Sequence, residues 1–243
     1  IDVSLVGSEM CIRDRWTPTW PPFRKRLTAA TLRQHHPSDA GSVHMPLPVL
    51  YSFRRCPYAM RARMSIVRER YEVELREVVL RDRPEHMMEI SPKGTVPVLL
   101  LPDGTVIEES LEIMQHVLDW QLSEEEAHWV ERNDEEFKFH LDRYKYPNRY
   151  DDVDEVEHRT LASAYLVDLD VRLGEGSAFA AQLNDALFPF VRQFANHDRA
   201  WFDAQPWSNV HDWLSRHLES DEFKRCMRKE KQWVSGSETV LFP

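Results

Sequence analysis

A cysteine followed by a proline is the part of this sequence best placed to do chemistry. Cys56 comes directly after an apolar run and two arginines, and Pro57 starts a segment whose apolar residues recur with helical spacing. Proline suits the first turn of a helix because its missing N–H is not needed there. Cys56 is therefore expected at a helix N-terminus, where unpaired backbone N–H groups and the helix dipole favour an anion.

A cysteine in that position is expected to be ionised at neutral pH. A free thiol has a pKa of about 8.5, and a helix N-terminus with basic neighbours lowers it to roughly 3.5–7.5. The candidate neighbours are Arg54, Arg55, Arg61 and Arg63. The alternative is a buried cysteine that packs as a small apolar side chain. Its position and the nearby charge favour the reactive form.

The elements expected around Cys56 follow the order β-α-β-α-β-β-α. The strands are predicted at 48–53, 73–80, 96–101 and 105–108, and the helices start at Pro57, Pro84 and Ser110. A helix between the first two strands predicts a right-handed crossover to a parallel neighbour. Asp103-Gly104 predicts a hairpin between the last two strands. This order is typical of an α+β, thioredoxin-like domain with a mixed four-stranded sheet, here over residues 46–122.

Residues 123–243 are expected to form a second, all-helical domain. Ser123 and Glu126 have the spacing of a capping box at the start of a long helix. The helices are predicted at 123–146, 154–173, 180–196, 198–204, 207–219 and 221–230.

Residues 1–45 are expected to be a disordered leader that is not native to the protein. They are rich in Pro, Thr, Arg and His without periodicity. The string from Ser4 to Arg15 also resembles a translated sequencing adaptor. We expect the native chain to start at Met45.

Composition narrows the function classes. The 243 residues include 31 Lys and Arg against 41 Asp and Glu, for a net charge of −10. The acidic C-terminal half gives no electrostatic footprint for nucleic acid or anionic lipid, so neither is expected as a partner. No run approaches the ~18 apolar residues of a membrane span. Three cysteines do not form a disulfide framework, which favours a reducing cytoplasm. No metal is expected, because His35-His36 has no further ligands at metal-site spacing.

Three motifs together resemble those of the cytosolic glutathione transferases. The run Cys-Pro-Tyr-Ala at 56–59 is similar to the active-site motif of the cysteine-type members, the omega class and the bacterial glutaredoxin-2-like proteins. Residues 91–97 (Ser-Pro-Lys-Gly-Thr-Val-Pro) and 107–110 (Ile-Glu-Glu-Ser) look like the family's two glutathione-binding signatures, at matching spacing. The resemblance covers about residues 47–243. It implies glutathione as co-substrate and places Tyr58 among the glutathione-binding residues.

The resemblance also implies how glutathione is held. The Val96–Pro97 bond would be cis, against a general frequency of ~5–6% for X-Pro bonds, and the Val96 backbone would pair with the cysteinyl unit. Ser110 and the N–H groups of its helix would bind the γ-glutamyl carboxylate, and Glu109 the ammonium group. Arg83 would grip the glycyl carboxylate as a fork. The simpler alternatives are a trans proline at a strand start, a serine that only caps a helix and a solvated arginine.

The implied function is a glutathione-dependent thiol transferase or reductase with Cys56 as the catalytic nucleophile. Ala59 stands where a dithiol motif would have its resolving cysteine, and Cys226 is expected to be structural, so the cycle would be monothiol. The acceptor would be a small disulfide, dehydroascorbate or a glutathionylated protein. Two alternatives remain open. One is a transferase that conjugates glutathione to an electrophile through a hydroxyl of Tyr51, Ser52 or Tyr58. The other is a non-catalytic binding or regulatory protein of the same fold.

The second substrate is expected to bind between the two domains. Phe137, His140, Leu141 and Tyr144 fall on one face of the first long helix and are the candidates to line that pocket. The alternative is that these side chains pack in the core. The family is typically homodimeric, but the glutaredoxin-2-like members are monomeric, so the resemblance leaves the oligomeric state open.

Overall fold

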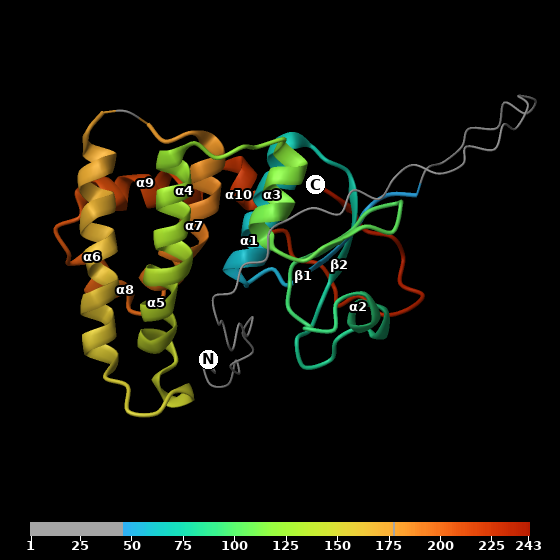
Figure 1. The fold of residues 1–243 in the computed structure, drawn as a ribbon, viewed down its shortest axis with the longest axis horizontal. Helices are drawn as coiled ribbons and strands as arrows, with labels where there is room; N and C mark the ends of the chain where they lie inside the picture. Colours follow the sequence, from blue (N-terminus) through green and yellow to red (C-terminus); the bar gives the residue numbers. More distant parts are fainter. Residues whose placement is uncertain (1–45, 177) are drawn as a thin grey trace, which may run out of the picture.

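The computed structural model describes residues 46–176 and 178–243 and has a sheet-containing domain beside a bundle of helices (Figure 1). The segment 1–45, with the expected leader and the expected start at Met45, lies outside the described residues.

The sheet has five strands, one more than the sequence predicted. In chain order the strands are β1 Val49–Ser52, β2 Val73–Glu77, β3 Val98–Leu100, β4 Val106–Ile107 and β5 Leu241–Phe242. They lie in the order β4-β3-β1-β2-β5, with β1 and β2 parallel and every other pair antiparallel. The mixed thioredoxin-like sheet is therefore confirmed. Its fifth strand comes from the last residues of the chain and pairs with the edge of β2.

Three helices cover the two faces of this sheet. They are α1 Pro57–Glu69, α2 Glu85–Ile90 and α3 Ser110–Leu118. Successive side chains of a strand point to opposite faces, so Leu50 packs with the apolar side chains of α1 and α3, whereas Tyr51 packs on the side of α2. The C-terminal end of β1 consequently leads straight into the turn that starts α1.

The second domain consists of helices, as predicted. They are α4 Glu124–Glu131, a π-helical segment η1 Arg132–Phe137, α5 Lys138–Lys145, a short 3₁₀ turn η2 Pro147–Arg149, α6 Glu155–Gly174, α7 Ala181–Ala195, α8 Arg199–Asp203, α9 Ser208–Glu219 and α10 Asp221–Cys226. The predicted capping box at Ser123 and Glu126 is present. The last helix ends at Cys226 and not near residue 230. Within the described residues, no helix is long and apolar enough to cross a membrane.

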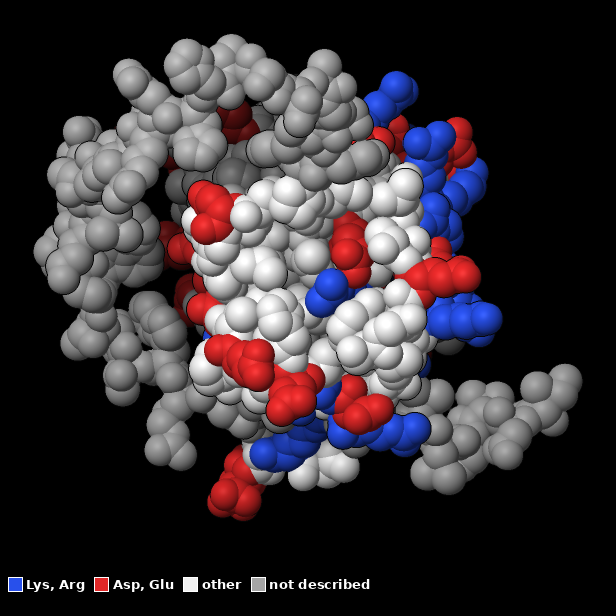
Figure 2. Space-filling view, turned by 90° about the vertical axis from the view of Figure 1, so that its right-hand side faces the viewer, with Lys and Arg blue, Asp and Glu red and all other residues white. Residues whose placement is uncertain are grey.

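The chain after α10 returns to the first domain. In Figure 1 this segment (red) runs from the helical bundle past the sheet, and the C-terminus lies close to the first domain. Its last strand pairs Phe242 with Val73 and Leu241 with Glu74. Where Figure 2 shows described residues, acidic and basic side chains lie side by side around a largely uncharged area, without a broad patch of one charge.

Candidate active site

Cys56 lies at the N-terminal end of α1, as the sequence predicted. It is the N-cap residue, with Pro57 in the first turn, and its backbone N–H donates to the carbonyl of Phe53 at 2.9 Å. The side chain is 4% exposed, and its Sγ lies 3.8 Å from the carbonyl oxygen of Val96. Cys56 is disulfide-bonded in the structure, so the chemistry discussed below is that of its reduced form.

The second motif, residues 91–97, contacts the first motif, residues 56–59, at Cys56 Sγ. The Val96–Pro97 peptide bond is cis, which confirms the expected geometry. Val96 lies two residues before β3, the strand that pairs with β1, and β1 leads to Cys56. The first and second motifs are therefore in contact.

The third motif is joined to the second by hydrogen bonds. Ser91 donates to the carboxylate of Glu108, and the Lys93 ammonium lies 2.7 Å from a carboxylate oxygen of Glu109. Ser110 is buried and is the first residue of α3. Glu109, and not Ser110, occupies the N-cap position, and its side chain makes no capping hydrogen bond. The simpler role of Ser110, that of a helix cap, is thus absent.

Arg83 is held in position by the loop of the second motif, residues 91–97. Its Nε donates to the carbonyl of Gly94 at 2.7 Å. Gly94 has a φ of +64°, and a Cβ added there would lie 3.1 Å from Met88 Sδ and 3.2 Å from Arg83 Nε. Arg83 also lines a cavity of about 370 Å³ between the start of α2 and the C-terminal segment, together with Asp82, Pro84, Glu85, His86, Glu89 and residues 232–235. The three motifs and Arg83 are thus connected to one another by contacts between their residues.

Two of the four arginines expected near Cys56 lie elsewhere, and that expectation is corrected. Arg61 is fully buried, with its guanidinium on the Asp134 carboxylate at 2.6 and 2.8 Å and its Nε on the carbonyl of Ala186. Arg63 is also fully buried and contacts Glu77 and the carbonyls of Cys226 and Arg228. A helix points successive side chains in different directions, and here these two face the domain interface. Of the four, Arg54 and Arg55 remain as candidates, because they directly precede Cys56 in the turn.

The three candidate hydroxyl residues, Tyr51, Ser52 and Tyr58, differ in their hydrogen bonds and packing. The Tyr51 hydroxyl accepts from Arg76 at 2.6 Å and shares a hydrogen bond with His86 at 2.7 Å, and burial raises its pKa. Ser52 is buried, and its Oγ has no hydrogen-bond partner among the described residues. Tyr58 packs edge-on against Phe190 of α7, with ring centroids 4.9 Å apart, so it lies where the two domains meet.

The residues expected to line a second-substrate pocket lie within the helical domain. Phe137 is fully buried and stacks on Tyr165, and Tyr144 is buried against His197. These two placements match the core-packing alternative. His140 is half-buried, and its Nδ1 lies 2.7 Å from the Nδ1 of His158; burial and this neighbour lower the pKa of His140.

Cys226 is a buried free thiol, as the structural role expected for it requires. Its Sγ–H donates to the carbonyl of Met60 at 3.7 Å, and burial raises the pKa of the thiol to about 12. Such a thiol is protonated at neutral pH and cannot act as a nucleophile. Among the described residues, no group of three or more His, Cys, Asp or Glu side chains could hold a metal ion.

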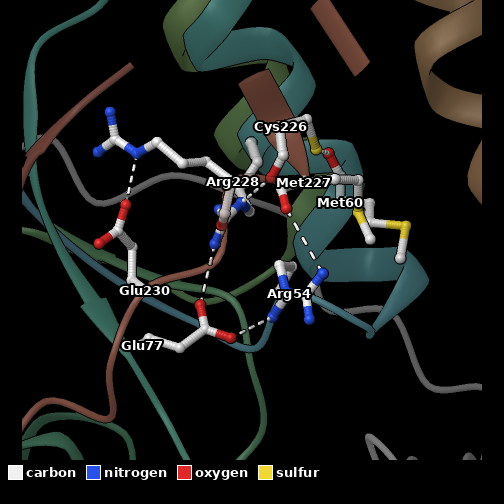
Figure 3. Close-up of polar contacts among 8 residues, drawn as sticks. Arg54, Met60, Glu77, Cys226, Met227, Arg228 and Glu230 are labelled. Atoms are coloured by element: carbon white, nitrogen blue, oxygen red, sulfur yellow. Dashed lines mark hydrogen bonds and ion pairs between the residues drawn. The ribbon is translucent and has the colours of Figure 1, made fainter. Parts of the chain in front are cut away.

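Sequence reasoning missed Glu77. Its carboxylate is nearly buried and accepts from the backbone N–H of Arg54 at 2.8 Å and from Arg63 Nη1 at 3.0 Å (Figure 3). The signal was present in β2, where Val73 and Leu75 mark the inward-facing positions and Glu77 continues the same alternation. A carboxylate at an inward position needs partners, and its neighbours in space were not visible in the sequence.

Known proteins resemble this chain in both sequence and fold. Residues 50–126 match the family of glutathione S-transferase N-terminal domains. A protein from Aplysia californica, described as a probable glutathione transferase, is 42% identical over 55 residues, which make up 23% of this chain and only 60% of that protein.

Solved structures extend the similarity to both domains. A glutathione transferase family member from Pseudomonas fluorescens, crystallised with two glutathione bound, has a TM-score of 0.66 at 17% identity, over 76% of this chain and 94% of its own. Glutathione transferase Omega 3C from Trametes versicolor has a TM-score of 0.59 at 18% identity, over 76% of this chain and 90% of its own. At such low identity these structures establish the fold.

Proposed function

We propose that this chain is a glutathione-dependent thiol transferase of the glutathione S-transferase family that uses Cys56 as a monothiol nucleophile. Residues 50–126 match that family's N-terminal domain, and the fold is shared with solved glutathione transferases. The observation that carries the proposal is the position of Cys56 Sγ, 3.8 Å from the Val96 carbonyl and at the N-terminus of α1. A helix N-terminus with Arg54 and Arg55 beside it favours the thiolate, which is the reactive form of cysteine.

Glutathione would lie along the edge formed by the three motifs. The Val96 backbone would pair with the cysteinyl unit as a short strand, which brings the glutathione sulfur to Cys56. The buried Ser110 and the N–H groups at the start of α3 would receive the γ-glutamyl carboxylate, and Glu109 the ammonium group. Arg83 would bind the glycyl carboxylate, and the ring of Tyr58 would border the same region. The glutathione bound in the Pseudomonas fluorescens relative supports this co-substrate.

The reaction follows from a single cysteine. The Cys56 thiolate attacks one sulfur of a disulfide, a new S–S bond forms, and the other sulfur leaves as a thiolate that takes a proton from water. A glutathione thiolate then attacks the sulfur that is bound to Cys56. A new disulfide forms between glutathione and that group, the bond to Cys56 breaks, and Cys56 leaves as a thiolate. Ala59 supplies no thiol to resolve the intermediate from within the chain, so glutathione must do so. The acceptor would be a small disulfide, dehydroascorbate or a glutathionylated protein in a reducing cytoplasm.

The test is the reduction of hydroxyethyl disulfide by freshly reduced protein with glutathione. Cys56→Ser is expected to lower the rate to that of the uncatalysed reaction. Cys226→Ser, the matched control, is expected to keep the rate because that thiol is buried. Mass spectrometry of the wild type should detect one glutathionyl group on Cys56. Full activity of Cys56→Ser would overturn the proposal. If that variant also conjugated glutathione to a chloronitrobenzene, the conjugating alternative would replace it.

A further inference from the structure

The C-terminal segment 227–243 is attached to the first domain along its length. Its last strand β5 extends the sheet beside β2. Before that strand, the backbone N–H of Trp233 donates to the carbonyl of Glu77 at 2.9 Å, and Leu75 donates to the carbonyl of Val240 at 2.8 Å. The Trp233 ring packs over the guanidinium of Arg76 at 4.3 Å. The segment is therefore held by backbone and side-chain contacts to the strand that neighbours β1.

Glu77 is the residue where this segment meets the turn that carries Cys56. Its carbonyl accepts from Trp233, one carboxylate oxygen accepts from the Arg54 backbone at 2.8 Å, and the other accepts from Arg63 at 3.0 Å (Figure 3). One residue thus bonds the turn, helix α1 and the C-terminal segment. Arg54 lies two residues before Cys56 in a tight turn.

The two arginines also hold the beginning of the segment. Arg63 donates to the carbonyl of Cys226 at 2.7 Å and to that of Arg228 at 3.2 Å, and Arg54 Nη1 lies 3.5 Å from the carbonyl of Met227. Figure 3 shows Arg54 between the Glu77 carboxylate and Met227. Each arginine therefore bridges Glu77 and the C-terminal segment, so moving the segment would disturb the same groups that hold the turn.

We infer that Glu77 is a positioning residue for Cys56 and that residues 227–243 hold Glu77 in place. The C-terminal segment is then part of the working site although it follows the last helix of the other domain. Glu77 acts through the Arg54 backbone, because the turn at Arg54 sets where Cys56 Sγ lies relative to the Val96 carbonyl. The expected effect of Glu77 on turnover rests on the proposed function. The expected effect of Glu77 on the reactivity of Cys56 does not.

The first test uses Glu77→Ala, which removes both carboxylate bonds, and Glu77→Gln, which keeps an acceptor for Arg54 but loses the charge facing Arg63. A misplacement of about 1 Å in an active site can cost about 100-fold in rate. We expect Glu77→Ala to lower kcat for disulfide reduction by about that factor with the KM for glutathione within about twofold, and Glu77→Gln to restore part of the loss. Glu74→Gln, in the same strand but on its opposite face, is the matched control and should leave kcat unchanged.

The second test measures Cys56 alone, through its rate of alkylation by iodoacetamide at pH 7 in freshly reduced protein, resolved from the other two cysteines by peptide mass spectrometry. Glu77→Ala should alkylate more slowly, because the sulfur moves away from the helix N-terminus that favours its thiolate. This readout needs no glutathione, so it stands even if the thiol transferase proposal fails. A folded Glu77→Ala protein with the alkylation rate of the wild type would overturn the inference. A Glu77→Ala protein in which only the KM for glutathione changes, with kcat unchanged, would also overturn it.

The contribution of the C-terminal segment is tested at Trp233. These variants keep the Glu77 side chain, so they test the inference even if the Glu77→Ala protein does not fold. Trp233→Pro removes the N–H that donates to Glu77, whereas Trp233→Ala keeps that N–H and removes the ring. We expect Trp233→Pro to alkylate Cys56 more slowly than Trp233→Ala does. Equal rates in the two variants would show that the bond to Glu77 does not position Cys56.

Discussion

Gly94 controls the candidate site without a side chain of its own. Its φ of +64° lies in the left-handed region, and its carbonyl accepts the Nε–H of Arg83. The loop can fold back on Arg83 and Met88 this closely only because no Cβ intervenes. The hydrogen bond to Gly94 fixes the direction of the Arg83 guanidinium, and Arg83 is the residue proposed to bind the glycyl carboxylate.

Gly94→Ala is expected to raise the KM for glutathione several-fold. The new Cβ would lie 3.2 Å from Arg83 Nε and 3.1 Å from Met88 Sδ, which forces both side chains to move. Gly104→Ala is the matched control, since Gly104 also has a positive φ but has no atom within 4 Å of the added Cβ. That control should lose about 1 kcal/mol of stability through backbone strain and keep its KM. Steady-state kinetics decide the matter, and equal KM values for the two variants would contradict the expectation.

His217 is a half-buried imidazole in α9 that packs against Phe188 and Trp213. Its pKa is lowered from 6.5 to about 4, chiefly by burial and then by the nearby Arg216 and Arg68, while Glu222 opposes the shift. The unfolded chain therefore binds a proton at this histidine at a higher pH than the folded chain does. By linkage, the stability it contributes is complete above about pH 6.5 and is lost as the pH falls toward about 4.

His217→Phe is therefore expected to flatten the acid side of the stability profile. Over this pH window the wild type should lose about 2–3 kcal/mol of unfolding free energy that the variant does not lose, since one pKa unit corresponds to about 1.4 kcal/mol. Urea unfolding at pH 7 and pH 4.5 measures the difference. His128→Phe, at an exposed position, should follow the wild type. A parallel decline in His217→Phe and the wild type would refute the assignment.

At the scale of elements, Arg70 ends α1 in a conformation that suits glycine better. It is the C-cap residue, with φ 53° and ψ 38°. An L-residue in this region costs roughly 1–2 kcal/mol, and glycine avoids most of that cost. Arg70 is exposed, so little packing is lost when its side chain is removed.

Arg70→Gly is expected to leave stability unchanged or raise it by up to about 1 kcal/mol. Glu69→Gly, one residue earlier and still helical, should cost about 1 kcal/mol, because glycine there loses backbone entropy with no conformational gain. Thermal unfolding of the two variants gives the comparison. An equal loss of stability in both would mean that the left-handed cap at Arg70 carries no strain.

The elements were predictable wherever a pattern repeated. The apolar alternation of β2 and the helical spacing after Pro57 placed both elements, and Ser123 marked the start of the long helix. Strand β5 was not predicted because two residues carry no periodicity and the strand exists only through its pairing with β2. The π-helical turn in η1 was likewise invisible, since it changes the helical register without altering composition.

The site was predictable to the extent that its residues belong to local motifs. Cys56, Val96 and Ser110 could be placed because each stands at a strand or helix terminus that the surrounding residues mark. The directions of Arg61 and Arg63 could not be predicted, because their partners lie far along the chain and long side chains reach toward whichever carboxylate the fold supplies. The role of Glu77 was hidden for the same reason.

At the scale of the whole molecule, α1 is the element that joins the two domains. Arg61 holds Asp134 in η1 through two hydrogen bonds, and Arg68 holds the fully buried Asp185 in α7 in the same way. The helix that carries Cys56 at its start therefore cannot separate from the helical domain without leaving buried charges unpaired. We expect the two domains of the wild type to unfold together.

Arg61→Leu tests this coupling. Among the described residues Asp134 would keep only the Asn133 amide as a donor, and the Ala186 carbonyl would lose the Arg61 N–H. The free energy of unfolding should therefore fall by about 3–5 kcal/mol. The double variant Arg61→Met with Asp134→Leu should recover most of the loss, since removing both charges leaves none unpaired. Arg81→Ala, at an exposed arginine, should change stability by less than about 0.5 kcal/mol.

Two probes in different domains reveal whether unfolding remains concerted. Alkylation of Cys56 follows the first domain. Tryptophan fluorescence follows the helical domain once the tryptophans at 16, 20, 120 and 233 are replaced by phenylalanine in every variant compared, which leaves those at 129, 201, 207 and 213. In the wild type both should report the same urea midpoint. In Arg61→Leu, fluorescence should report the lower midpoint, because the uncompensated Asp134 lies in the helical domain while Cys56 keeps the support of the sheet and of Glu77. If the midpoint of Arg61→Leu equals that of the wild type, the buried arginines of α1 do not join the two domains.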